Sequence, residues 1–147
     1  MRVFPTTLLI LSLSLTSAIQ ANPADELPEP TDIFLTLTSE DPEIQFMALV
    51  ISMEAAKEGA QVRILLCGEA GDLALSDVES PAILPPEISP AQLLERLLEH
   101  GALVQVCAIY LPQRELDPSE LREGITTATP PEIAAIWQDS SQRLLSF

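Results

Sequence analysis

Apolar runs of strand length alternate with segments of helical periodicity along this chain, and this alternation most restricts its fold. The expected strands cover 33–38, 61–67, 102–107, a short stretch within 124–129, and 143–147. The expected helices between the first three strands cover 42–59 and 90–101, and a glycine stands at or near the end of each. Apolar strands separated by amphipathic helices are typical of a parallel sheet that is covered on both faces. We therefore expect a single three-layer α/β/α domain with a mainly parallel sheet of about five strands.

Four dipeptides mark helix starts, because each places a capping side chain before a proline. They are Asp41-Pro42, Ser89-Pro90, Asp117-Pro118 and Thr129-Pro130. Proline at the first helical position loses no hydrogen bond, because an amide there has no intrahelical partner. Gln92, Glu120 and Glu132 follow three of these prolines by two residues and complete capping boxes.

The first 21 residues have the features of a secretory signal peptide. Arg2 is followed by the short apolar run Leu8–Leu15 and then by small residues, which predicts cleavage after Ala18 or Ala21. The run is too short for a membrane span, which needs roughly 20 residues. We expect a periplasmic or secreted protein without a membrane anchor. Residues 22–31 are acidic and proline-rich, which predicts a flexible N-terminus ahead of a domain at 32–147.

The charge of the chain limits its partners. There are 22 acidic and 7 basic side chains among the 147 residues, which gives a formal net charge of −15. Nucleic acids and anionic membrane surfaces both require cationic patches, so neither is expected as a partner. A single histidine, His100, excludes a catalytic triad and histidine-rich metal sites, and we read it as a helix-end residue. The sequence predicts no metal and no cofactor.

Two cysteines stand at the ends of predicted strands, where parallel sheets gather their chemistry. Cys67 leads into a segment with two acids, Glu69 and Asp72, which disfavour a thiolate. Cys107 is followed by Tyr110 and Arg114, which offer a hydroxyl and a positive charge that favour one. Cys107 is therefore the candidate nucleophile, with Tyr110 and Arg114 as supports. Cys67 is the candidate structural or redox partner, and the two thiols either form a bridge or stay free.

The segments 32–66, 93–125 and 129–147 resemble the DsrE/YchN-like proteins. The most specific feature is the helix, glycine and strand that run from His100-Gly101 to Val106-Cys107. The resemblance implies a flavodoxin-like domain that assembles as trimers or hexamers. It also implies that the cysteine ending this strand, here Cys107, carries a persulfide and passes sulfane sulfur to a partner protein. Relay members tend to have arginine followed by glycine after it, where this chain has Arg114 and Glu115.

Three functions remain open from the sequence. The leading hypothesis is an exported sulfur carrier, of sulfurtransferase-like chemistry, that handles sulfane sulfur through a persulfide on Cys107. The alternative is a non-enzymatic oligomeric module that binds a ligand or a protein, in which Cys107 is inert or disulfide-bonded. A third reading is a thiol-redox protein that opens and closes a Cys67–Cys107 bridge.

Overall fold

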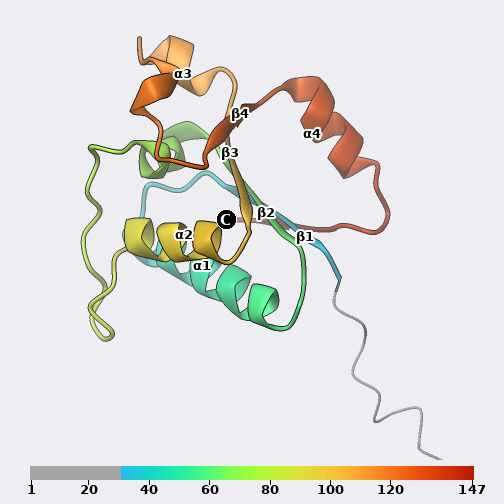
Figure 1. The fold of residues 1–147 in the computed structure, drawn as a ribbon, viewed down its shortest axis with the longest axis horizontal. Coiled ribbons are helices and arrows are strands. Elements are labelled where there is room, and N and C mark those ends of the chain that lie inside the picture. Colours follow the sequence, from blue (N-terminus) through green and yellow to red (C-terminus); the bar gives the residue numbers. More distant parts are fainter. Residues whose placement is uncertain (1–30) are drawn as a thin grey trace, which may run out of the picture.

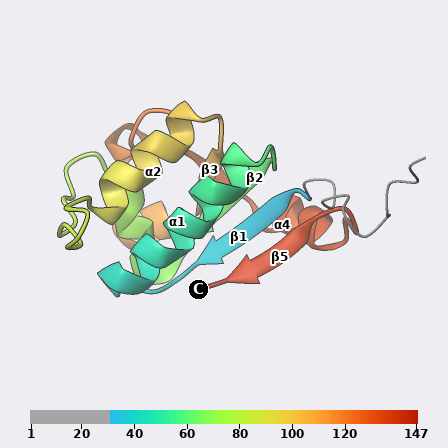
Figure 2. The same ribbon diagram turned by 90° about the horizontal axis from the view of Figure 1, so that it is seen from below.

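A computed structural model describes residues 31–147, so the predictions for the signal peptide and for almost all of residues 22–31 lie outside the described residues. The described chain forms a five-stranded sheet in the order β4-β3-β2-β1-β5 (Figures 1 and 2). The strands are β1 (Ile33–Leu37), β2 (Val62–Leu66), β3 (Leu103–Cys107), β4 (Thr126–Ala128) and β5 (Arg143–Ser146). Every strand pair is parallel. The predicted three-layer α/β/α, flavodoxin-like architecture is confirmed.

The helices lie on both faces of the sheet, and the two layers are unequal. Helices α1 (Pro42–Lys57) and α2 (Pro90–Glu99) pack side by side on one face, as Figure 2 shows. Helix α4 (Pro130–Trp137) covers the other face, and the short α3 (Tyr110–Gln113) follows β3. Two 3₁₀ helices, η1 (Gly68–Ala74) and η2 (Pro118–Glu120), complete the structure. None of the helices within 31–147 combines the length and apolar character needed to cross a bilayer.

Alternation along the strands divides the core into a large and a small cluster. Ile64, Leu66, Val104 and Val106 point toward α1 and α2 and belong to the large cluster. The small cluster, on the α4 face, has four buried members, which are Phe34, Leu65, Ala128 and Ile133. Large apolar side chains on this side stay exposed, among them Trp137 at 60% and Leu144 at 48%. The α4 face is therefore only partly covered in the single chain.

The predicted helix starts are present, and one of them begins a much shorter element than expected. Asp41 accepts hydrogen bonds from the first-turn amides of α1, and Ser89 forms a capping box with Gln92 at α2. Glu132 accepts from the Thr129 N–H at 2.7 Å and caps α4. Asp117 forms the expected capping box, yet it begins only the three residues of η2. The chain leaves the helix there because Leu121 pairs with Leu75 in an isolated antiparallel bridge.

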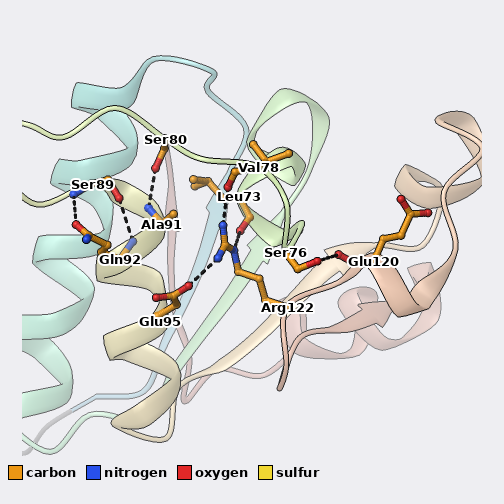
Figure 3. A network of polar contacts seen from close by, with 10 residues as sticks. All are labelled: Leu73, Ser76, Val78, Ser80, Ser89, Ala91, Gln92, Glu95, Glu120 and Arg122. Atoms are coloured by element: carbon orange, nitrogen blue, oxygen red, sulfur yellow. Dashed lines mark hydrogen bonds and ion pairs between the residues drawn. The ribbon is translucent and has the colours of Figure 1, made fainter.

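Arg122 ties this part of the chain to its neighbours (Figure 3). Its guanidinium donates to the carbonyl oxygens of Leu73 at 3.0 Å and Val78 at 2.6 Å. It also pairs with the Glu95 carboxylate of α2 at 2.6 Å. The Arg122 side chain is only 13% exposed, so these bonds join η1, the segment after it and α2 from within the structure. The loop that follows Cys67 is thereby held in place.

Candidate functional site: the cysteine pair at the carboxyl ends of β2 and β3

The two cysteines lie side by side at the carboxyl edge of the sheet and are joined in a disulfide, with Cα atoms 5.3 Å apart. The register of the β2–β3 ladder explains this placement. It pairs Leu66 with Val106, so the next residue of each strand, Cys67 and Cys107, falls beside the other. A Cα separation of about 5.5–6 Å is the commonest for cystines, so the sheet spacing already suits the bond. As predicted, Cys107 ends its strand, and Cys67 lies one residue beyond the end of β2.

Backbone hydrogen bonds fix each cysteine independently of the disulfide. The Cys67 N–H donates to the Leu37 carbonyl of β1 at 3.0 Å. On the other side, Cys107 stands opposite Ala128 in the β3–β4 ladder, and the Ala108 N–H donates to the Ala128 carbonyl at 3.0 Å. The pair is thus held by the strands on either side of it, β1 and β4. The two thiols would remain neighbours after reduction.

Both cysteines are half-buried, and they face the α4 side of the sheet. They pack against the small cluster that contains Leu65, Ala128 and Ile133. Gln105, two residues before Cys107, lies on the same face, as alternation predicts, and it is buried. The sulfur atoms are therefore neither enclosed in the main core nor fully open to solvent.

Tyr110 and Arg114 connect the two loops that leave the cysteines. The Tyr110 hydroxyl donates to an Asp72 oxygen at 2.5 Å. The Arg114 guanidinium lies 4.3 Å from the centre of the Tyr110 ring and donates to the Glu69 carboxylate at 2.9 Å. Arg114 also approaches Asp72 at 3.7 Å. We call these four residues, Glu69, Asp72, Tyr110 and Arg114, the loop clamp, because they join η1 to α3.

The loop clamp gives Tyr110 and Arg114, the predicted thiolate supports, other partners than Cys107. The sequence placed the acids beside Cys67 and the arginine beside Cys107, as separate influences. In the described chain, the hydrogen bonds and ion pairs of Tyr110 and Arg114 go to those acids and not to Cys107. A direct role of Tyr110 and Arg114 in stabilising a thiolate stays a prediction. The contacts that Tyr110 and Arg114 make in the structure hold the two loops in position.

Burial raises the pKa of the Tyr110 phenol well above its usual value near 10, and the hydrogen bond to Asp72 and the charge of that carboxylate raise it further. Tyr110 is therefore a neutral hydrogen-bond donor in the clamp at physiological pH. Gly71 makes room for it, because a Cβ atom at Gly71 would overlap the Tyr110 ring. Sequence reasoning missed Gly71, although a second glycine so soon after Gly68 is a signal that the backbone is closely approached there.

Gly68 allows the chain to turn directly after Cys67. Its φ of 58° lies in the left-handed region that glycine adopts without steric cost. His100 lies at the C-terminal end of α2, before the start of β3 and so at the opposite end of that strand from Cys107, and its Nδ1 lies 2.9 Å from the Arg96 carbonyl oxygen. Among residues 31–147, no cluster of three or more His, Cys, Asp and Glu side chains is arranged to hold a metal ion. The chemistry of this edge therefore centres on the two sulfur atoms.

Comparison with known proteins places the fold in a described class. No protein-family model matches the chain. An uncharacterized protein of Methanopyrus kandleri, MK0008, is 29% identical over 123 residues, which are 82% of this chain and 98% of that protein. Among solved structures, the ychN protein from E. coli superimposes with a TM-score of 0.67 at 18% identity, over 80% of this chain and 99% of that one.

A second solved structure, of the protein of unknown function MTH1491 from Methanobacterium thermoautotrophicum, superimposes with a TM-score of 0.60 at 13% identity. The match covers 80% of this chain and 99% of that one. The chain thus has the DsrE/YchN-like fold, with a cysteine pair at the carboxyl ends of β2 and β3. The resemblance in the sequence is confirmed at the level of this fold.

Proposed function

We propose that this protein accepts and carries sulfane sulfur as a persulfide on Cys107. The observation that supports this most is the position of Cys107, at the end of β3 and half-buried. The resemblance gives this strand end to the sulfur-carrying cysteine. In α/β folds with parallel sheets, ligands are bound outside the carboxyl ends of the strands, and Cys107 lies there.

The reaction requires the pair in its reduced form, because thiolate is the nucleophile. The Cys107 thiolate attacks the outer sulfur of a persulfide donor. The bond from Cys107 Sγ to that sulfur forms, the sulfur–sulfur bond of the donor breaks, and the donor leaves as a thiolate. No cofactor is needed for this transfer.

Export to the periplasm or outside the cell is part of the proposal. It rests on the signal peptide features of residues 1–21. A cysteine pair whose Cα separation of 5.3 Å allows a disulfide suits an oxidising compartment. A dedicated reductant would then have to open the bond before sulfur transfer begins.

We further propose a homo-oligomer, a trimer or hexamer. Ile44, Met47 and Ile51 share one side of α1 and are each at least 40% exposed. Trp137 and Leu144 add exposed apolar area beside the α4 face. Exposed apolar patches of this kind mark association sites. Light scattering coupled to gel filtration measures the subunit number, and a monomer at micromolar concentration would contradict this part.

The competing function is a binding module in which the Cys67–Cys107 bond is only structural. The observation that favours it is the joined state of the pair. Intact-mass measurement separates the two. The chain is reduced, freed of reductant and treated with glutathione persulfide, and free thiols are trapped at intervals. A trapped adduct of about 32 Da that is absent from Cys107→Ser supports the carrier. A reduced chain that neither gains sulfur nor releases sulfide supports the module.

A further inference from the structure

We infer that Cys67 resolves the persulfide on Cys107, so that the protein reduces sulfane sulfur to sulfide. This inference rests on the proposed persulfide chemistry and names the fate of the sulfur. A simple relay needs one cysteine and an external acceptor. Here a second cysteine is already the bonded neighbour of the first, with Cα atoms 5.3 Å apart. The nearest acceptor of a persulfide on Cys107 is therefore inside the same chain.

The step is a thiol–disulfide exchange within the pair. The Cys67 thiolate attacks Cys107 Sγ, and the Cys67 Sγ–Cys107 Sγ bond forms while the bond from Cys107 Sγ to the outer sulfur breaks. The outer sulfur leaves with the electron pair, takes the proton that Cys67 released, and departs as hydrosulfide. The sulfane sulfur is reduced by two electrons, and the two cysteines are oxidised to the disulfide. The product is the joined pair of this structure.

The geometry favours this step over transfer to another protein. The cysteines stay adjacent without the bond, because the ladder sets the register of Leu66 and Val106 and each cysteine has its own strand neighbour. The loop clamp joins the segments that come after them through Tyr110–Asp72 and Arg114–Glu69. Groups held in reacting position gain effective concentrations of about 10⁵ M or more, far above that of any partner protein. Resolution within the chain should therefore precede external transfer.

The cycle closes with an external dithiol reductant, which returns the disulfide to two thiols. For each sulfane sulfur taken up, one sulfide is released and one dithiol is consumed. The activity assigned to the pair is thus that of a thiol-dependent sulfane sulfur reductase, and its substrate class is persulfides and polysulfides of small thiols.

The test is a single turnover with the reduced full chain under nitrogen, with reductant removed. Wild type, Cys67→Ser and Cys107→Ser each receive one equivalent of glutathione persulfide. Sulfide is measured by monobromobimane labelling and the protein by intact mass. We expect the wild type to release one sulfide per chain and to gain the disulfide. Cys67→Ser should release only the blank amount and should keep the adduct of about 32 Da. Cys107→Ser should release no sulfide above the blank and should gain no adduct.

The outcomes separate the inference from the proposed function. If wild type and Cys67→Ser both hold a stable adduct and release no sulfide, resolution by Cys67 is overturned and the carrier survives. If neither wild type nor Cys67→Ser gains sulfur or releases sulfide, the proposed persulfide chemistry itself fails. Sulfide release from Cys67→Ser with a glutathione adduct would mean that Cys107 attacks the inner sulfur, which also overturns the inference. Cys67→Ala serves as a second variant, and Trp137 fluorescence in urea checks that each variant is folded.

Discussion

The Tyr110 hydroxyl donates a hydrogen bond to Asp72 across the two loops that come after Cys107 and Cys67, with the oxygens 2.5 Å apart. This bond joins segments that are separated by 38 residues in the chain. It stands at the centre of the loop clamp, since Arg114 lies over the Tyr110 ring and Gly71 is the turn residue that admits the ring. The clamp thus joins the two segments that follow the cysteines.

The first prediction concerns the ionisation of Tyr110, the only tyrosine in the chain. Burial and Asp72 raise its pKa in the folded protein. In the unfolded chain the phenol ionises near 10. The raised folded value contributes stability that is complete below about pH 10 and is lost as pH rises above it. Absorbance titration at 295 nm should show phenolate only well above pH 10 in the native protein.

The matched variant for this titration is Asp72→Asn. It removes the charge of the acceptor and leaves the burial in place, so the phenolate should appear at lower pH than in wild type. The same titration in concentrated urea gives the unfolded reference for both chains. A native phenolate signal that coincides with the urea curve would contradict the buried, hydrogen-bonded Tyr110.

The second prediction is that Gly71→Ala destabilises the fold through Tyr110. The added methyl overlaps the ring, and overpacking of this kind costs about 1–3 kcal/mol. Urea unfolding followed by circular dichroism measures the loss. In a Tyr110→Ala background the same substitution should cost far less, because the obstructing ring is gone. An equal cost in both backgrounds would rule out the ring as the cause.

The third prediction is that Arg122→Ala lowers the free energy of unfolding by about 2–3 kcal/mol, because two carbonyl oxygens lose a charged donor. Arg96→Ala is the control, since it removes the same charge from an exposed position on α2. Its effect should stay within about 0.5 kcal/mol. Chemical denaturation of the two variants under identical conditions makes the comparison. A similar loss of unfolding free energy in both variants would show that the net charge, rather than the buried hydrogen bonds of Arg122, sets the stability.

The fourth prediction concerns Glu115, which has a φ of 55° after α3. This left-handed conformation costs a residue with a Cβ atom about 1 kcal/mol. Glu115→Gly should therefore be more stable than Glu115→Ala by about that amount, although both lose the same charge. Thermal and urea unfolding of the pair test this. A left-handed residue at this position favours glycine, which is the residue that relay members tend to have after the arginine.

The fifth prediction is that reduction lowers the free energy of unfolding by about 2–4 kcal/mol without unfolding the protein. The bond links residues 40 positions apart, and removing it frees the unfolded chain. The strand hydrogen bonds around both cysteines remain, so the reduced chain should still unfold cooperatively in urea. The Cys67→Ser, Cys107→Ser double variant should be insensitive to reductant. A reduced chain that is unstructured would remove the basis for the sulfur chemistry.

The elements and the fold class could be predicted from local signals, because capping boxes and apolar runs act within a few residues. Ser89 with Gln92 and Thr129 with Glu132 are such signals, and both hold in the structure. Asp117 gave the same signal but begins only η2, because the pairing of Leu121 with distant Leu75 ends the helix. A local motif could not reveal that long-range pairing.

The site was predicted in part. The strand-end positions of Cys67 and Cys107 follow from the apolar runs before them, but their adjacency depends on strand order and register. The same is true of Arg114, whose carboxylate partners lie on the loop after Cys67. From the sequence, Glu69 and Asp72 were predicted to influence Cys67 alone. Trp137 is exposed in the single chain because α4 is short and turns only Ile133 fully into the sheet.

The thin layer under α4 has a consequence for how reagents reach the sulfur atoms. Within residues 31–147, the small cluster that holds α4 to the sheet has four buried side chains, and both cysteines pack against it. The free energy needed to detach α4 is therefore smaller than that needed to disrupt α1 and α2, which rest on the large cluster. Transient detachment of α4 would expose the cysteine pair to solvent while the rest of the molecule stays folded. Local opening of α4, rather than global unfolding, would then set the rate at which a bulky thiol or a reductase reaches the cysteine pair.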